Sequence, residues 1–270
     1  MIGQPTIDNF INSFSTKFSA RCNLIIGERG CGKHLLIKEL SGRLKLPLTD
    51  ITECVDGDFV SSMYERTVSI IYFVNLSEMQ RKRQNVLLKV IEEPPTGAFI
   101  FLLAENHTQV LPTILNRCNI VTFSPYKKED LLKFMPIGSD NEMLDRALML
   151  CKTPGQVKDC IGTDLGGLIE FTDKIVDKIG NANIANTMSI VNKLAFKNEK
   201  GLWDYTLFSR SLLCSIRNKA LQKEDTRLYR ALWCVAEHIK IDTSYNVDKK
   251  ANMENMLINL WGIFRDSTGT

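Results

Sequence analysis

The sequence lacks the patterns that mark several common classes of protein. Its eight cysteines include no C-x-x-C pair, and most have apolar neighbours, so buried thiols are expected rather than a disulfide framework. Charged residues interrupt every apolar run well before the roughly 18 residues needed to span a bilayer. No signal-peptide pattern opens the chain. We therefore expect a cytoplasmic globular protein without a membrane segment, and its 270 residues allow two or three compact units.

The chain also has little excess of charge of either sign. Its formal net charge is +3, which does not by itself indicate binding to nucleic acid. The basic run Arg81-Lys82-Arg83 could contact a phosphate backbone or an acidic neighbouring surface, but its composition favours a solvated charged surface. Of the histidines, we expect His107 to have no catalytic role and His238 to be structural.

The most informative stretch is a glycine-rich turn, Gly27–His34, which we call the phosphate loop. The apolar run Asn23-Leu24-Ile25-Ile26 precedes it, and a helical pattern follows from Leu35 to Leu40. A strand, a glycine-rich turn and a helix in this order are the context of a phosphate-binding loop, because backbone N–H groups converge there on an anion. The candidate nucleotide-binding residues are Gly27, Gly30, Gly32, Lys33 and His34.

The phosphate loop lacks one part of a hydrolytic site. Lys33 stands where the loop lysine reaches the outer phosphates, but the next residue is His34 instead of serine or threonine. Imidazole is a poor magnesium ligand, because Mg²⁺ prefers hard oxygen ligands in octahedral geometry. The sequence therefore predicts a nucleotide-binding shape without a complete magnesium site.

Strand and helix patterns alternate through the first half of the chain. Residues 1–20 predict an amphipathic helix with Ile7, Phe10, Ile11, Phe14 and Phe18 on one face. Apolar runs at 69–74, 98–104 and 119–123 predict strands, the first two buried on both faces, and 108–115 predicts a short helix. This alternation predicts a parallel sheet covered by helices on both faces.

Only helical patterns follow Pro125. Residues 126–135 and 141–151 are expected to be helical, with a break at Lys152-Thr153-Pro154-Gly155. Two apolar stripes mark later helices: Tyr205, Phe208, Leu212 and Ile216, and then Met253, Met256, Leu257, Leu260, Trp261 and Phe264. We predict an α/β domain over 1–124, a small helical domain over 125–164 and a second helical domain over 165–270.

Two motifs resemble those of the AAA+ subunits of DNA polymerase III clamp loaders, most closely delta-prime and also gamma/tau. Residues 85–95, N-V-L-L-K-V-I-E-E-P-P, are similar to the family's N-A-L-L-K-x-L-E-E-P-P. Residues 111–118, L-P-T-I-L-N-R-C, are similar to L-P-x-T-I-L-S-R-C, and we call them the Arg117 motif. Ile2-Gly3-Gln4 and 246–260 resemble the family's first motif and last collar helix.

The resemblance implies a fold and a role. The fold is an AAA+ domain with a parallel sheet, a helical lid and a C-terminal helical collar. The role is that of one subunit in a hetero-pentamer that opens a sliding clamp and closes it on primed DNA. ATP lies between neighbours in such an assembly. One subunit supplies the phosphate loop and the next an arginine, whose position here is that of Arg117, a trans-acting arginine finger.

Other catalytic groups of the family are missing from this chain. Val74-Asn75 or Asn75-Leu76 stand where active members carry Asp-Glu, and Gly155 stands where a sensor arginine is usual. With His34, these differences predict no useful hydrolysis. Two alternatives remain open for the phosphate loop: ATP or ADP bound without turnover, or a loop kept for its backbone geometry.

The family's four-cysteine zinc module is also missing. The corresponding interval contains only Cys54, so we expect no zinc. Two other functions remain as alternatives: a gamma-like subunit that hydrolyses ATP, and an AAA+ helicase loader or adaptor. The motif at 85–95 and the last helix disfavour the helicase loader.

Overall fold

The computed structural model describes residues 2–66, 68–135, 148–161, 164–179, 185, 189, 205–244 and 247–265. The chain forms two compact units. The α/β unit comprises Met1–Phe134 and Lys152–Gln156, and the helical unit comprises Met135–Cys151 and Val157–Thr270. The division into three domains at 124 and 164 stays a prediction.

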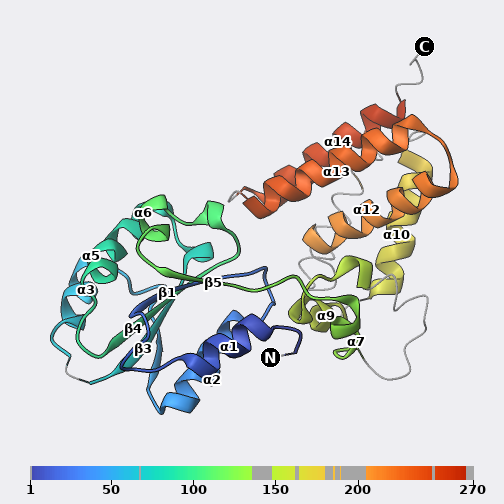
Figure 1. Cartoon of the computed structure of the whole chain (residues 1–270). Coiled ribbons are helices and arrows are strands. Elements are labelled where there is room, and N and C mark those ends of the chain that lie inside the picture. The colour runs from blue at the N-terminus through green and yellow to red at the C-terminus, as the bar shows by residue number, and fades with distance from the viewer. Residues whose placement is uncertain are drawn as a thin grey trace. The chain divides into compact units, whose positions relative to one another are not determined.

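The α/β unit is built on a parallel sheet of five strands among the described residues (Figure 1). The strand order is β2-β3-β4-β1-β5, so the first strand lies between the last two. The predicted α/β fold with a parallel sheet is therefore confirmed. The strands are β1 (Cys22–Ile26), β2 (Leu48–Asp50), β3 (Ile70–Asn75), β4 (Ala98–Ala104) and β5 (Asn119–Thr122).

Strands β4 and β1 are buried on both faces. The sequence predicted this for β4, whereas Phe73 of β3, for which the same was predicted, is half-buried. All seven residues of β4 and all five of β1 are buried. Along β4, Ile100 and Leu102 belong to one core cluster, and Phe99 and Phe101 belong to a second. Because successive side chains of a strand point to opposite faces, these two clusters lie on the two sides of the sheet.

Helices and short turns connect the strands of the α/β unit. The α-helices are α1 (Pro5–Ser13), α2 (Lys33–Leu44), α3 (Gly57–Met63), α4 (Arg81–Gln84), α5 (Leu88–Glu92), α6 (Pro112–Leu115) and α7 (Lys128–Leu132). The 3₁₀ turns are η1 (Leu76–Glu78), η2 (Asn85–Leu87) and η3 (His107–Gln109). The predicted helix over 108–115 is thus divided into η3 and α6, because the chain is extended at Val110 and Leu111 before Pro112 begins α6.

The N-terminal helix is shorter than its apolar spacing suggested. Ile7, Ile11 and Phe14 are buried, but the side chain of Phe18 is 90% exposed, so its predicted place on the apolar face is wrong. The physical reason is that α1 ends at Ser13 and Phe14 has an extended backbone, which ends the helical periodicity before residue 18. Strand β2 was not predicted, because three residues carry too little periodicity to be recognised.

The described helices of the helical unit pack around one core cluster. They are α10 (Leu165–Lys178), α12 (Tyr205–Gln222), α13 (Thr226–Ser244) and α14 (Lys249–Arg265), while α9 (Pro154–Ile161) begins in the α/β unit (Figure 1). The predicted stripes supply core residues, including Phe208, Leu212, Met256 and Leu257. Most of the predicted helix over 141–151 falls in residues 136–147, which lie outside the described residues. Asn246 lies outside them as well.

His238 joins two helices of the helical unit. His238 on α13 has its Nδ1 2.7 Å from Asn252 Oδ1 on α14, and Asn252 Nδ2 donates to the His238 carbonyl. The expected structural role of His238 therefore agrees with its contacts, which join two helices.

No described helix combines the length and the apolar character needed to cross a lipid bilayer.

Candidate functional site

The phosphate loop follows directly on the carboxyl end of β1 and leads into α2. Gly30 and Gly32 have φ values of 80° and 109°, a backbone conformation that favours glycine, and Gly32 is the N-cap of α2. A Cβ at Gly27 would lie 2.6 Å from Cys31 Sγ and 2.9 Å from Phe123 Cβ. The predicted strand–loop–helix context is therefore present, and its glycines are required by the local geometry.

The ammonium group of Lys33 is held by carbonyls of its own loop. Lys33 Nζ donates to Gly27 O at 2.5 Å and to Glu28 O at 3.2 Å. The side chain is buried, and this burial lowers the pKa of Lys33, while Cys31, Glu105 and Glu28 oppose the shift electrostatically. The lysine therefore stabilises the loop from within.

Residues Lys152–Gln156, which we call the covering segment, pack on the outside of the phosphate loop. Thr153 Oγ1 donates to Arg29 O at 2.8 Å, and Gly155 N donates to Gly30 O at 2.9 Å. A Cβ added at Gly155 would lie 2.5 Å from Gly30 Cα, so only glycine allows this approach. An ion pair of 3.7 Å between Lys152 Nζ and Glu28 Oε1 extends the contact.

The covering segment was not foreseen from the sequence. Gly155 drew notice only because a sensor arginine was missing from its position, and its contact with Gly30 joins residues 125 positions apart in the chain. The positive signal was the T-P-G break between helices, which predicts a turn but not what the turn contacts.

The position of the usual magnesium ligand is occupied by an aromatic contact. The exposed His34 ring lies 5.4 Å from the Phe73 ring at an interplanar angle of 87°, an edge-to-face arrangement. Phe73 belongs to β3, next to the residues where the family's carboxylates are expected. His34 therefore contributes an aromatic packing contact at this point and no hard oxygen ligand.

The carboxyl end of β3 carries no pair of carboxylates among the described residues. Val74 is buried, and Asn75 Nδ2 donates to the exposed Glu78 carboxylate at 2.6 Å. The Asn75 N–H donates to Thr52 Oγ1, whose hydroxyl donates in turn to Asp50 Oδ1 at 2.6 Å. These polar groups fix the turns that follow β2 and β3.

The three residues that follow β4 have different environments. Asn106 Oδ1 caps η3 by accepting from the N–H groups of Thr108 and Gln109, and His107 is exposed. Glu105 is half-buried and is close enough to Lys33 to favour the charged lysine. Of the three, Glu105 is the residue linked electrostatically to the phosphate loop.

Arg117 lies on the surface just after α6, within the Arg117 motif. Its Nε is 2.7 Å from Glu92 Oε1 at the end of α5, and its Nη1 donates to the Thr113 carbonyl at 3.0 Å. The Arg117 side chain is 42% exposed. The two motifs recognised separately in the sequence thus meet through this ion pair.

The basic run 81–83 does not behave as a simple solvated surface. Arg81 Nη2 donates to Thr108 O at 2.6 Å, and Arg83 Nη2 donates to Glu53 O at 2.9 Å. Both guanidinium groups therefore join loops to α4 through main-chain carbonyls. Arg81 and Lys82 are exposed, as expected of a solvated run, whereas Arg83 is half-buried, so the expectation is wrong for Arg83.

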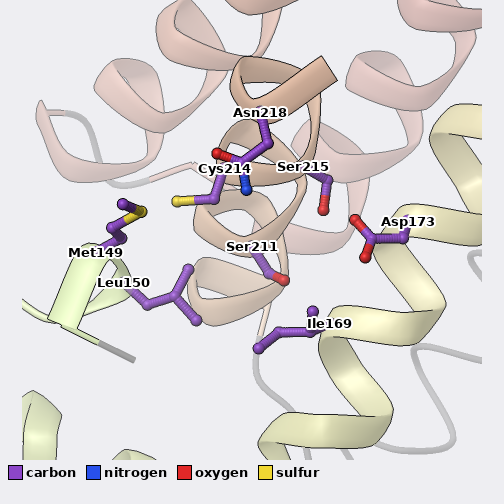
Figure 2. A pocket seen from close by; sticks show the side chains of 8 residues that line it. All are labelled: Met149, Leu150, Ile169, Asp173, Ser211, Cys214, Ser215 and Asn218. Carbon is purple, nitrogen blue, oxygen red and sulfur yellow. The ribbon is translucent and has the colours of Figure 1, made fainter. Parts of the chain in front are cut away.

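A small hollow in the helical unit lies between α10 and α12 (Figure 2). Its walls include Ser211 and Ser215, whose hydroxyl oxygens are 2.9 Å and 3.1 Å from Thr172 Oγ1. Thr172 thus engages both serine hydroxyls, and the wall also includes the polar side chains of Asp173 and Asn218. The described residues contain no cluster of His, Cys, Asp and Glu with the arrangement of a metal site.

The fold and the phosphate loop together define the class of protein: an AAA+-like P-loop domain followed by a helical bundle. The family model described as DNA polymerase III, delta subunit, matches residues 47–127, which include both recognised motifs. Residues 47–127, less than a third of the chain, are therefore similar to this family.

One solved structure supports this fold assignment. A DNA polymerase III gamma subunit-related protein from Thermotoga maritima superposes with a TM-score of 0.50 at 16% identity, covering 96% of this chain and 100% of that chain. At this identity the likeness shows a shared fold. Two variants of Thermotoga maritima RuvB match 78% of this chain with TM-scores of 0.47, at 13% and 14% identity, and cover 86% and 74% of those chains. No curated protein matches the sequence.

Proposed function

We propose that this chain is a non-hydrolysing clamp-loader subunit that supplies Arg117 to the ATP site of a neighbouring subunit. The assembly would be a hetero-pentamer that loads a sliding clamp on primed DNA, and the helical unit would contribute to its collar. The single observation that carries the proposal is the half-exposed Arg117 guanidinium in a motif similar to the family's S-R-C sequence.

The chemistry of Arg117 supports a role in trans. A guanidinium is always charged and can donate several hydrogen bonds to phosphate oxygens, so it can stabilise the charge that develops during phosphoryl transfer. Within the described residues, its contacts are one carboxylate and one carbonyl, and they use Nε and Nη1. The hydrogens of Nη2 remain for a group outside this chain.

The chain's own phosphate loop supports the absence of turnover. His34 packs against Phe73, the end of β3 offers Val74 and Asn75, and Gly155 is bound to the backbone of Gly30. Phosphoryl transfer depends on positioned charges and metal ligands, and each such group is commonly worth roughly 3 kcal/mol. The lack of three of them argues against an ATPase centre in this subunit.

The proposal is tested in a reconstituted loader assembled from this chain, its ATPase partner subunits, clamp and primed DNA. Arg117→Ala should lower the stimulated ATPase rate at the neighbouring ATP site by about 10³-fold or more, the order expected for an arginine finger. Arg117→Lys should recover only a small part, because an ammonium lacks the planar fork of the guanidinium.

Two controls separate this outcome from a general loss of charge or folding. Lys82→Ala removes a cation from the same α/β unit and should leave the ATPase rate unchanged. Size-exclusion chromatography should show the Arg117→Ala chain in the assembly. An unchanged ATPase rate in an intact Arg117→Ala assembly contradicts the proposal, and so does ATP turnover by the isolated chain.

A further inference from the structure

We infer that Glu92 is the residue that positions Arg117, holding the guanidinium by its Nε so that the Nη end is presented to the neighbouring subunit. The inference rests on the proposed function, because it gives Glu92 a purpose only if Arg117 acts in trans. Glu92, at the end of α5 and far from Arg117 in the sequence, is thereby part of the arginine site.

Within the described residues, Nε and Nη1 of the Arg117 guanidinium have partners and Nη2 has none. Glu92 Oε1 is 2.7 Å from Arg117 Nε, and the Thr113 carbonyl accepts from Nη1 at 3.0 Å. Nε carries one hydrogen, whereas Nη1 and Nη2 carry two each. One hydrogen of Nη1 and both of Nη2 are therefore available to an incoming phosphate oxygen.

Both partners of the pair are fixed by their own elements. Glu92 is the last residue of α5, and Pro94-Pro95 prevents the helix from continuing. Arg117 follows α6, and its N–H donates to the Ile114 carbonyl at 3.0 Å. Because both backbones are anchored, the ion pair restricts the long arginine side chain rather than joining two mobile segments.

The exposure of the pair argues for orientation rather than for stability. The side chains of Arg117 and Glu92 are 42% and 49% exposed. Ion pairs exposed to this degree contribute little to the free energy of unfolding, because water screens the charges and side-chain entropy opposes the contact. The same contact removes rotamers of a side chain that must reach a phosphate, which favours the productive orientation before the neighbour arrives.

The adjacent carboxylate provides a matched control. Glu93 is also exposed and lies in the same motif, but its main-chain carbonyl accepts from the Tyr64 hydroxyl at 2.9 Å. No ion pair joins Glu93 to Arg117 in the described part of the chain. Glu92→Gln and Glu93→Gln therefore make the same chemical change, and only Glu92→Gln removes the charge from the arginine.

The first test needs only the isolated full-length chain. In NMR spectra of the arginine Nε–Hε groups, the signal of Arg117, assigned with Arg117→Lys, should shift and exchange faster with water in Glu92→Gln. It should be unchanged in Glu93→Gln. A signal that is the same in Glu92→Gln and the unmodified chain would mean that the pair does not form in solution, which overturns the inference.

The second test uses the assembled loader. Glu92→Gln should lower kcat of the stimulated ATPase by about two- to five-fold, the effect of losing a weak exposed pair, with KM for ATP unchanged. Added salt should diminish the difference, because ions screen exposed charges. On the Arg117→Ala background, Glu92→Gln should have no further effect.

The possible outcomes separate the inference from the function on which it rests. If Arg117→Ala abolishes stimulation and Glu92→Gln matches the unmodified chain, the positioning role fails and the arginine finger stands. If Glu92→Gln raises kcat, Glu92 restrains the arginine instead of presenting it, and the inference is again wrong. If Arg117→Ala has no effect, the proposed function fails, and the positioning role fails with it.

Discussion

The phosphate loop and the Arg117 motif belong to the same α/β unit, but their contacts differ in kind. Carbonyls of the loop accept hydrogen bonds from Lys33 and from the covering segment, so the loop is fastened by its own chain. Arg117 is half exposed and uses two of its three nitrogens within the chain. The loop is therefore held by contacts within the chain, whereas the Arg117 guanidinium keeps hydrogen-bond donors for a further partner.

The contrast extends to the residues around each region. Near the loop, positions that would hold a magnesium ligand or a sensor arginine contain His34 and Gly155, and both make structural contacts. Near the arginine, the Glu92 carboxylate pairs with the guanidinium without burying it. The contacts described near the loop are therefore packing contacts, whereas the charge of Arg117 stays accessible.

The largest difference between the two regions is expected in the ATPase rate when the cation of each region is removed in turn. In the reconstituted assembly, Lys33→Ala should change the ATPase rate by less than about twofold, against about 10³-fold for Arg117→Ala. The reason is that Lys33 is used by its own loop, while Arg117 would act on the neighbour's nucleotide. Steady-state phosphate release measures both. A large loss in Lys33→Ala, with the chain still assembled, would show that this subunit turns over ATP itself.

The next largest effect is expected where the covering segment meets the loop. Gly155→Ala places a methyl group 2.5 Å from Gly30 Cα, so backbone must move, and we expect a loss of roughly 2–3 kcal/mol in the free energy of unfolding. Urea denaturation followed by circular dichroism measures it. Gly42→Ala is the matched control: its Cβ meets nothing within 4 Å, inside α2.

The control should move in the opposite direction. Replacing a glycine in a helix interior by alanine reduces the entropy of the unfolded chain, so Gly42→Ala should stabilise by about 0.5–1 kcal/mol. Equal stability of Gly155→Ala and the unmodified chain would show that the segment does not pack on the loop as described.

A smaller effect is expected at Tyr126, whose hydroxyl donates to the Cys31 carbonyl of the loop at 2.7 Å. Tyr126→Phe should cost about 1 kcal/mol, because one carbonyl of the loop loses its partner. Burial, assisted by nearby acidic groups, raises the pKa of Tyr126 from 10.0 to about 12.

The same variant should change the alkaline limb of the stability curve. Between pH 10 and 12, unfolded tyrosine loses its proton while folded Tyr126 keeps it, so the stability from this group falls as pH rises. Denaturation midpoints of Tyr126→Phe should therefore fall less steeply over this range than those of the unmodified chain. Parallel curves would contradict a hydroxyl held in the folded state.

The smallest effect is expected from restoring the usual loop residue. His34→Ser returns a hydroxyl to the magnesium position but removes the contact with Phe73, so a stability loss of roughly 0.5 kcal/mol is expected. ATP hydrolysis by the isolated chain should stay at background, because the carboxylate pair is still missing after β3. Turnover gained from this single change would mean that the loop is an ATPase site lacking only one ligand.

The local features of the fold could be predicted because their causes are local. Strands β1, β3 and β4 were recognised from uniformly apolar runs, and the phosphate loop from glycines between a strand and a helix. The same logic failed at Phe18, where spacing suggested a helix that had already ended. It also failed at the half-buried Arg83, because a charged run does not reveal which main-chain carbonyls lie within reach.

The sequence by itself determined most of the strand and helix pattern and the resemblance of two motifs to clamp-loader subunits, since each depends on residue types in short segments. Only the tertiary structure decided that Gly155 packs on Gly30 and that Glu92 binds Arg117. Both pairs join residues that are distant along the chain. Their contacts exist because the folded α/β unit holds the intervening backbone within hydrogen-bonding distance, and no local pattern encodes that distance.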